Sequence, residues 1–440
     1  MRESRNGFGR KGWSVVIFVG LLFMISIAAA DLLNVSPKLF EEAYGWDANG
    51  LLAYSSVGGW LGVAATMFFG QWVAAKGAKT PTVIFLFVFA ALYFLNGQVK
   101  SVAAYGIVVI LLMAVCNCLN LVSTNTYMSN WFHRKKGIAL GFAAMGIPAC
   151  EAVLVPLFAW VARVGGGIGE PFTVISLITA AIALLAIFII RATPEEAGTR
   201  PDNDPPEASA QNVSDGQSAW TVGMLLRSRQ MWLVSIVFGL FMINSSSTMT
   251  QFVPRVMAAG STMTEGTLWL AVSSVVGVLG NYIIGSLDQK FGTKATVIGF
   301  GVYLAAMQFL LAAATGSKAG TMILAVMTAV LVGGVFNLLP SMIMQIFGPP
   351  EFASVNRVVT PVVVALRNVT FVLMACVLGA TGGSYRALSI VLGCMTIVAI
   401  LLALRLSNRM IGAPTVSRGH KTDTHRLNQN RPEGMTNEKS

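Results

Sequence analysis

The stretch of sequence that decides the fold runs from Trp131 to Glu151 and reads WFHRKKGIALGFAAMGIPACE. Its three consecutive basic residues, 134–136, mark a membrane surface, because Lys and Arg gather in cytosolic loops. Its last residue, Glu151, places a lone carboxylate inside an apolar segment, where a charge needs a partner or a pathway. Between them stand small residues that favour tight helix contact: Gly137, Gly141, Ala144 and Gly146.

The composition of the whole chain agrees with a membrane location. Of the 440 residues, 55% are hydrophobic and only 11% are charged, and the mean hydropathy is +0.69. Soluble domains carry about 25% charged residues. The basic N-terminus, with Arg10 and Lys11, leads into an apolar run that continues past Ala30 without a cleavage site, so we interpret it as a first spanning helix rather than a signal peptide.

Segments of about twenty apolar residues predict the spanning helices. Twelve are present, so we expect an all-α membrane protein with two six-helix halves: 13–36, 50–74, 80–98, 102–129, 137–162, 172–190, 230–253, 266–287, 294–314, 320–346, 355–379 and 385–405. The predicted divisions are an N-terminal half at 1–191, a polar cytosolic linker at 192–229, a C-terminal half at 230–406 and a disordered cytosolic tail at 407–440.

Loop charges predict the orientation of the helices. With the N-terminus inside, 23 Lys and Arg residues fall on the cytosolic side and 6 on the outer side, while Arg367 lies within a helix. Both termini are therefore expected in the cytosol, with the chain in the plasma (inner) membrane. The net charge of +11 is explained by this topology and by contact with anionic lipid, which excludes a nucleic-acid partner.

An internal repeat relates the two halves. Asn120 recurs as Asn337, displaced by 217 residues. A glycine–basic loop after the second helix of each half recurs with a displacement of 215 residues: Gly70, Gly77 and Lys79 correspond to Gly285, Gly292 and Lys294. These matches indicate a duplicated six-helix unit.

The repeated loop resembles the signature G-x-x-x-D-R/K-x-G-x-R/K of the major facilitator superfamily. The first copy has Ala74 in place of the Asp, and the second copy keeps Lys290. The resemblance implies a transporter fold that is self-sufficient as a monomer, with gating by these loops.

The 131–146 segment is similar, more narrowly, to the fifth-helix motif of monocarboxylate transporters and oxalate/formate antiporters. These relatives carry an Arg on helix eight at the substrate site, where this chain has Asn281.

Polar side chains on helices 4, 7 and 10 predict a wet cavity between the halves, because polar groups in hydrocarbon need partners or water. Interhelical hydrogen bonding is the alternative explanation. Helices 3, 6, 9 and 12 are nearly pure apolar and are expected to face lipid. The candidate substrate contacts on the polar helices are Asn120, Asn244, Gln251 and Asn337.

Buried ionisable residues are the strongest candidates for function. Arg367 lies near the midplane, and its guanidinium suits a carboxylate. Glu151 occupies the equivalent site of the other half, at a displacement of 216 residues; it is either a proton carrier or a structural partner of a hydroxyl or helix end. Asp31 is a second candidate for proton coupling, and Arg255 is expected to anchor at the outer interface.

We therefore expect a secondary active transporter of a small organic anion, a mono- or dicarboxylate, working by proton symport or anion exchange. The alternatives are an exporter of lipophilic compounds, favoured by 21 methionines, and a non-transporting membrane sensor. Enzyme motifs and a P-loop are absent from the sequence. The five cysteines lack metal-site spacing and are interpreted as packing residues. No metal and no cofactor is expected.

Overall fold

The computed structural model describes residues 8–132, 136–203, 220–314, 316–329, 332–348 and 351–411. Within them, eleven helices are long and apolar enough to cross a membrane. The predicted tenth segment is represented by two shorter apolar helices, α17 (Lys318–Ala329) and α18 (Val332–Phe347). The all-α, twelve-segment architecture is thus confirmed. Arg134, Lys135, most of the predicted linker (204–219) and most of the predicted tail (412–440) lie outside the described residues.

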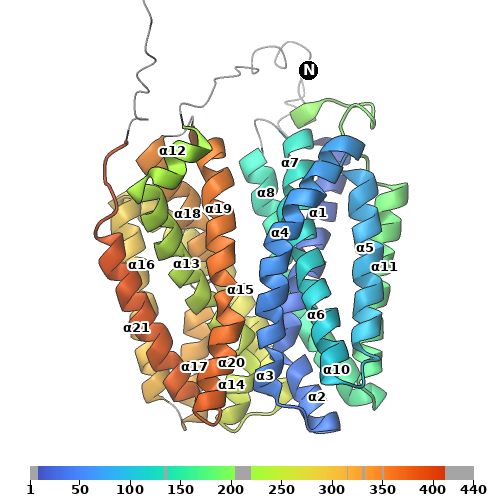
Figure 1. The fold of residues 1–440 in the computed structure, drawn as a ribbon, viewed down its shortest axis with the longest axis vertical. Helices are drawn as coiled ribbons and strands as arrows, with labels where there is room; N and C mark the ends of the chain where they lie inside the picture. Colours follow the sequence, from blue (N-terminus) through green and yellow to red (C-terminus); the bar gives the residue numbers. More distant parts are fainter. Residues whose placement is uncertain are drawn as a thin grey trace, which may run out of the picture.

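The N-terminal six-helix half is coloured blue to green in Figure 1. The first spanning helix ends in a short 3-10 turn (η1). The fourth and fifth spanning helices each contain a π-helical segment (η2 and η3). The elements are α1 (Gly9–Asp31), η1 (Leu32–Asn34), α2 (Ser36–Tyr44), α3 (Ala48–Leu51), α4 (Ala53–Lys76), α5 (Lys79–Asn96), α6 (Val102–Asn117), η2 (Cys118–Ser123), α7 (Thr124–Trp131), α8 (Lys136–Ala144), α9 (Gly146–Ala149), η3 (Cys150–Leu154), α10 (Val155–Gly165) and α11 (Gly169–Phe188).

The C-terminal half, yellow-green to red in Figure 1, follows a short 3-10 turn, η4 (Pro201–Asn203). Its eleventh segment is divided into α19 and α20 at Asn368. Besides α17 and α18, its elements are α12 (Val222–Arg227), α13 (Arg229–Thr250), α14 (Phe252–Ala258), α15 (Met263–Phe291), α16 (Thr293–Ala313), α19 (Phe352–Arg367), α20 (Val369–Ala380) and α21 (Tyr385–Ala403).

The repeated loops have matching geometry in the two halves. Lys79 Nζ donates to the carbonyl of Ile187 at 2.7 Å, and Lys294 Nζ donates to that of Leu404 at 2.8 Å. Each lysine thereby satisfies a carbonyl at the end of the last helix of its own half. The glycine before each, at 77 and 292, has a positive φ (76° and 82°) that glycine adopts without strain.

The other residues of these loops have less defined surroundings. No atom lies within 4 Å of a Cβ placed at Gly70 or Gly285. Lys290 stands over the ring of Phe291, 5.3 Å from its centroid. The role of the loops in gating remains a prediction.

Of Gly141 and Gly146 in the opening stretch, only Gly146 packs closely against helix 1. The surroundings of Gly137 lie outside the described part of the structure. A Cβ on Gly146 would lie 2.0 Å from the carbonyl oxygen of Gly20, so α9 touches the backbone of α1. Gly141, in contrast, has no neighbour within 4 Å of a Cβ position. The expected tight contact at Gly141 is therefore wrong, because this residue is on the exposed side of α8.

The two halves are joined at the end of the molecule opposite the linker. The main apolar core runs from the N-terminal half into α14, α20 and the start of α21, whereas the linker-side residues of the C-terminal half form a core of their own. Figure 1 shows α2, α3, α14 and α20 together at this joined end. The structure is therefore closed at that end.

Hydrogen bonds reinforce the closed end. Trp60 Nε1 donates to the carbonyl of Ala365 at 2.9 Å, and the Val253 amide donates to Asn34 Oδ1 at 3.1 Å. The Ser56 hydroxyl donates to the carbonyl of Asn368 and accepts from the Val372 amide. These bonds, which link residues more than 200 positions apart, tie α4 and η1 to the C-terminal half.

Candidate functional site

A cavity of about 40 Å³ lies between the halves, where α1, α4, α6 and η2 face α19 and α20. Its apolar wall includes Met113, Val364 and Phe371. A single water needs about 10–15 Å³, and small-molecule pockets usually reach about 300 Å³ or more. The cavity is therefore large enough for water but contracted relative to a substrate site. Its polar side chains are Asn117, Asn120, Arg367 and Asn368.

Arg367 brings a guanidinium to this cavity from the C-terminal half. It is the last residue of α19, just before the division at Asn368. Its Nε donates to the Ser246 hydroxyl on α13 at 3.0 Å. Within the described part of the chain this is the only hydrogen bond of the guanidinium, which leaves Nη1 and Nη2 available to a ligand. Two such donors suit the parallel oxygens of a carboxylate.

Two asparagines face Arg367 from the N-terminal half. Asn117 Nδ2 donates to the Gly59 carbonyl at 3.1 Å, and Asn120 Nδ2 donates to the Ser26 hydroxyl at 3.2 Å. Asn120 lies on the π-helical segment η2. Single π-helical turns inside α-helices frequently mark functional sites, because the extra residue redirects a side chain. The substrate role of Asn120 remains a prediction.

Two buried carboxyl groups, Asp31 and Glu151, lie in the N-terminal half, and Asp31 directly follows Ala30 of the cavity wall. Asp31 ends α1, Glu151 lies on the π-helical segment η3, and both side chains are 8% exposed. They interact electrostatically, and Asp31 also interacts with Arg367. The Cys150 thiol also lies near Asp31, whose Oδ2 is buried without a hydrogen-bond partner among the described residues. Asp31 is thus the group that Glu151 and Arg367 have in common.

Glu151 does not form an ion pair with Arg367. Its Oε2 instead accepts a hydrogen bond from the Ser274 hydroxyl on α15 at 2.6 Å. The repeat correctly relates the two positions in sequence, but η3 faces α15, whereas α19 faces α4 and α13. A hydroxyl partner is one of the two roles that the sequence allows for Glu151. The hydrogen bond from Ser274 joins the two halves.

Asn244 does not line the cavity between the halves, although the sequence predicts it as a substrate contact there. Only 1% of it is exposed. Its Nδ2 donates to Thr396 Oγ1 at 2.6 Å, and its Oδ1 accepts from Gln308 Nε2 at 2.7 Å. Helices 9 and 12 (α16 and α21) therefore carry buried polar side chains toward α13. That their apolar faces meet lipid remains a prediction. This network stabilises the C-terminal half internally.

The remaining candidates are spread along the C-terminal half. Gln251 is at the closed end, where its Oε1 accepts from the Tyr385 hydroxyl at 3.0 Å. Asn337 is an exposed residue of α18. Asn281 belongs to α15, and its side chain is outside the described part of the structure. Neither Gln251 nor Asn337 lines the 40 Å³ cavity.

Arg255 is buried, although the sequence indicated an interfacial anchor. Only 4% of it is exposed. It lies on α14, a short helix between α13 and α15 whose residues from Phe252 to Val256 are all buried. Its position next to Pro254 suggested a loop at the membrane surface, but α14 folds back into the closed end.

Sequence reasoning missed several polar contacts of the site. Ser246 was present in the polar run of helix 7, but no pattern distinguished it from its neighbours as the partner of Arg367. Ser274 stands in an apolar segment and gave no signal. Cys150 was interpreted as a packing residue, and only the fold brings its thiol to Asp31.

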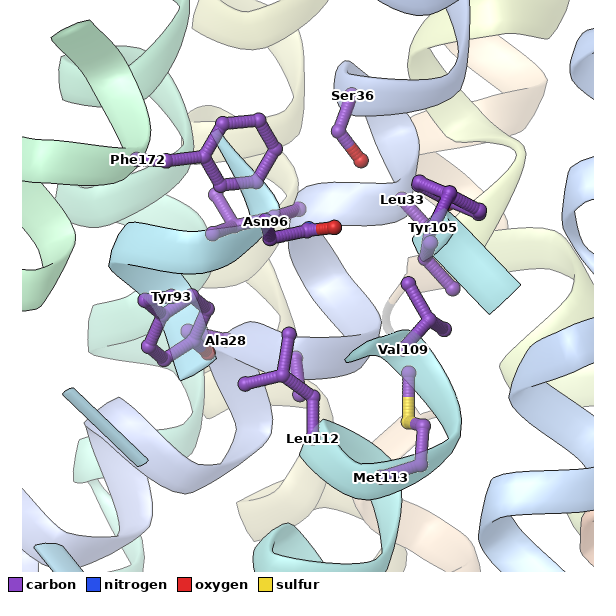
Figure 2. A pocket seen from close by; sticks show the side chains of 12 residues that line it. Ala28, Leu33, Ser36, Tyr93, Asn96, Tyr105, Val109, Leu112, Met113 and Phe172 are labelled. Atoms are coloured by element: carbon purple, nitrogen blue, oxygen red, sulfur yellow. The ribbon is translucent and has the colours of Figure 1, made fainter. Parts of the chain in front are cut away.

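A second cavity, of about 10 Å³, lies entirely within the N-terminal half (Figure 2). Figure 2 shows Asn96, Tyr105 and Phe172 around it. Asn96 Oδ1 and the Tyr105 hydroxyl are buried there without a hydrogen-bond partner among the described residues. The volume suits at most one water, so this cavity is too small for a substrate.

Comparison with known proteins agrees with this architecture. The family model described as Major Facilitator Superfamily matches residues 13–366. The fold is similar to that of a bacterial homolog of the human lysosomal transporter Spinster, in an inward-facing and occupied conformation, with a TM-score of 0.65 and 14% identity over 89% of this chain and 96% of that one. It is also similar to a D-xylose–proton symporter, with a TM-score of 0.65 and 13% identity over 90% and 97% of the two chains. No curated protein sequence matches the chain.

Proposed function

This chain belongs to the Major Facilitator Superfamily, and on that premise we propose that it moves a small organic anion, a mono- or dicarboxylate, by secondary active transport. Membership makes it a multi-pass membrane transporter rather than an enzyme. The anionic substrate, the coupling ion and the narrower likeness to monocarboxylate transporters and oxalate/formate antiporters are parts of the proposal.

One observation carries the choice of an anion. Arg367 presents a guanidinium with two unused nitrogen donors to a cavity between the halves. A cation in the membrane interior costs at least about 2.5–3.5 kcal/mol and is normally paired or placed on a substrate path. Asp31 interacts with Arg367 electrostatically, but no carboxylate among the described residues lies within 4 Å of the guanidinium, so a ligand carboxylate can pair with it directly.

The proposed transport cycle is a rocking motion of the two halves around Arg367. In the closed-end state, Trp60 and Asn34 bond across to the C-terminal half, and Ser274 bonds across to Glu151. Opening that end requires these bonds to break, while the linker side closes around the cavity. With the orientation indicated by the loop charges, this state faces the cytosol.

Asp31 and Glu151 supply a proposed route for proton coupling. Two buried carboxylates that interact repel each other when both are ionised, and a proton delivered to either one removes that repulsion. Protonation of Glu151 also exchanges a charged acceptor for a neutral one in its bond with Ser274, and hydrogen bonds to charged groups are the stronger kind. Proton binding is thereby linked to a contact that closes one end.

Replacing Glu151 by Gln is expected to separate exchange from coupling. The amide keeps an acceptor for Ser274 but cannot carry a proton. We expect carboxylate exchange to continue within about threefold of the wild-type rate, and accumulation driven by a pH gradient to be lost. Uptake into proteoliposomes with and without the gradient measures both, with Asn244→Asp as a control for charge in a network away from the cavity. An unchanged response to the gradient would remove Glu151 from coupling.

We also propose that the transporter works as a monomer in the plasma (inner) membrane, with both termini in the cytosol. The excess of basic residues in the loops on that side supports the proposed orientation.

The proposed substrate class is tested by uptake of labelled carboxylates into proteoliposomes. The panel consists of lactate, oxalate and succinate, each compared with its neutral amide. We expect saturable uptake of at least one acid and none of its amide. Efflux of lipophilic compounds without uptake of any acid would instead support the exporter alternative.

A further inference from the structure

Arg255 is the one arginine of the described residues whose three guanidinium nitrogens are all buried without a hydrogen-bond partner. Only 4% of its surface is exposed. Among the described residues, the guanidinium has one partner, the ring of Tyr385. This is a cation–π contact with 5.8 Å between the guanidinium carbon and the ring centroid. The Tyr385 hydroxyl donates to Gln251 Oε1, but Arg255 donates no hydrogen bond to this oxygen.

A buried and unpaired charge is unfavourable, because desolvation is not repaid by a counter-charge. A cation–π contact returns only about 0.5–2 kcal/mol. The closed state thus leaves Arg255 with less stabilisation than it would have in water or beside an anion. A residue in this position favours any state in which it is solvated or bound to an anion.

Arg255 is placed where the rocking motion exposes it. Its helix, α14, packs against η1 of the N-terminal half, and the Val253 amide bonds to Asn34 Oδ1 across the two halves. Separation of the halves at this end therefore uncovers the surroundings of Arg255, while Arg367 lies deeper, at the cavity between them.

We propose that Arg255 is a second anion-binding residue, which takes the substrate carboxylate at the end opposite the linker when that end is open, before the carboxylate reaches Arg367. This inference rests on the proposed function and adds a capture site to it. Five guanidinium N–H donors without a hydrogen-bond acceptor among the described residues are available to the carboxylate. The Tyr385 ring supports the guanidinium from one face.

The binding site has a direct consequence for the cycle. The carboxylate must leave Arg255 before the end closes, because closure buries this guanidinium. Transfer toward Arg367 then replaces one arginine partner by another. The unpaired charge that remains favours reopening of the same end.

The test compares Arg255→Gln with Arg255→Lys and with Arg386→Gln, which removes an exposed arginine near the same end. Uptake of lactate, oxalate and succinate is measured in proteoliposomes of known orientation, from each side separately. We expect Arg255→Gln to raise KM from the end opposite the linker at least tenfold and to leave KM from the linker side within twofold. Arg255→Lys should be intermediate, and Arg386→Gln should match the wild type.

A melting curve of the purified protein supplies a readout that does not depend on transport. If Arg255 is unpaired in the closed state, Arg255→Gln should melt at the wild-type temperature or above it. A lower melting temperature would assign Arg255 a structural partner and overturn the inference, as would an unchanged KM or an equal rise from both sides. If the wild type transports no carboxylate, the proposed function itself is wrong, and the capture site is wrong with it.

Discussion

Arg367→Ala is expected to lower carboxylate uptake by at least about thirtyfold while the protein still inserts and folds. Truncating one partner of a buried charge pair costs about 2–5 kcal/mol, and 1.4 kcal/mol corresponds to a factor of ten. Alanine removes both free guanidinium donors at the cavity, and no other arginine or lysine lines it. Initial rates in proteoliposomes, normalised to the amount of folded protein, measure the effect.

Two further variants separate charge from packing in this prediction. Arg367→Lys keeps the charge but not the paired donors, so it should retain part of the activity with a raised KM. Ser246→Ala removes the hydroxyl that accepts from Nε and should have a smaller effect than loss of the guanidinium. Wild-type uptake by a folded Arg367→Ala protein would show that the substrate is not held by this residue.

Gly146→Val is expected to destabilise the protein more than any other substitution in the 131–151 stretch. A Cβ at this position would lie 2.0 Å from the carbonyl oxygen of Gly20, a backbone atom that cannot turn away. Helices α1 and α9 would have to separate, and overpacking of this kind costs about 1–3 kcal/mol or more. We expect a lower melting temperature in detergent and a lower yield of monodisperse protein.

Gly141→Val is the matched control, because it makes the same change five residues earlier in the same membrane segment. No atom lies within 4 Å of its Cβ position, so its melting temperature should stay close to that of the wild type. Equal destabilisation by both variants would mean that valine itself, rather than the contact with Gly20, is responsible.

The sequence predicted the global architecture because the bilayer imposes strong and simple constraints. Apolar length marks each span, and eleven of the twelve predicted segments correspond to single long helices or helices that bend within one span. The repeat is visible in the sequence because both copies meet the same structural needs. The glycines at 77 and 292 adopt a positive φ, and Lys79 and Lys294 each donate to a carbonyl at the end of the last helix of their half.

The partners within the site were not predictable, because they depend on how helices rotate against each other. Glu151 and Arg367 are equivalent in sequence, yet one bonds to Ser274 and the other to Ser246. Asn244 has the same polar character as Asn120, but α13 turns it toward Gln308 and Thr396. A difference of a few tens of degrees about a helix axis decides such outcomes, and composition does not encode it.

The burial of Arg255 illustrates the same limit. Its sequence position after Pro254 and before a Gly–Ser turn is typical of a loop at the membrane surface. The chain instead forms one more short helix, α14, that is covered by both halves at the closed end. Only tertiary packing reveals that this arginine is sealed off without a hydrogen-bond partner.

The most direct test of the central claim, that Arg367 holds a carboxylate between the two halves, is ligand binding to the purified transporter. Thermal stabilisation is measured for the wild type and for Arg367→Ala with lactate, oxalate and succinate, and with their amides. We predict that at least one acid raises the melting temperature of the wild type, that its amide does not, and that Arg367→Ala shows no response to either. Equal stabilisation of the wild type and the variant by the acid would contradict the claim.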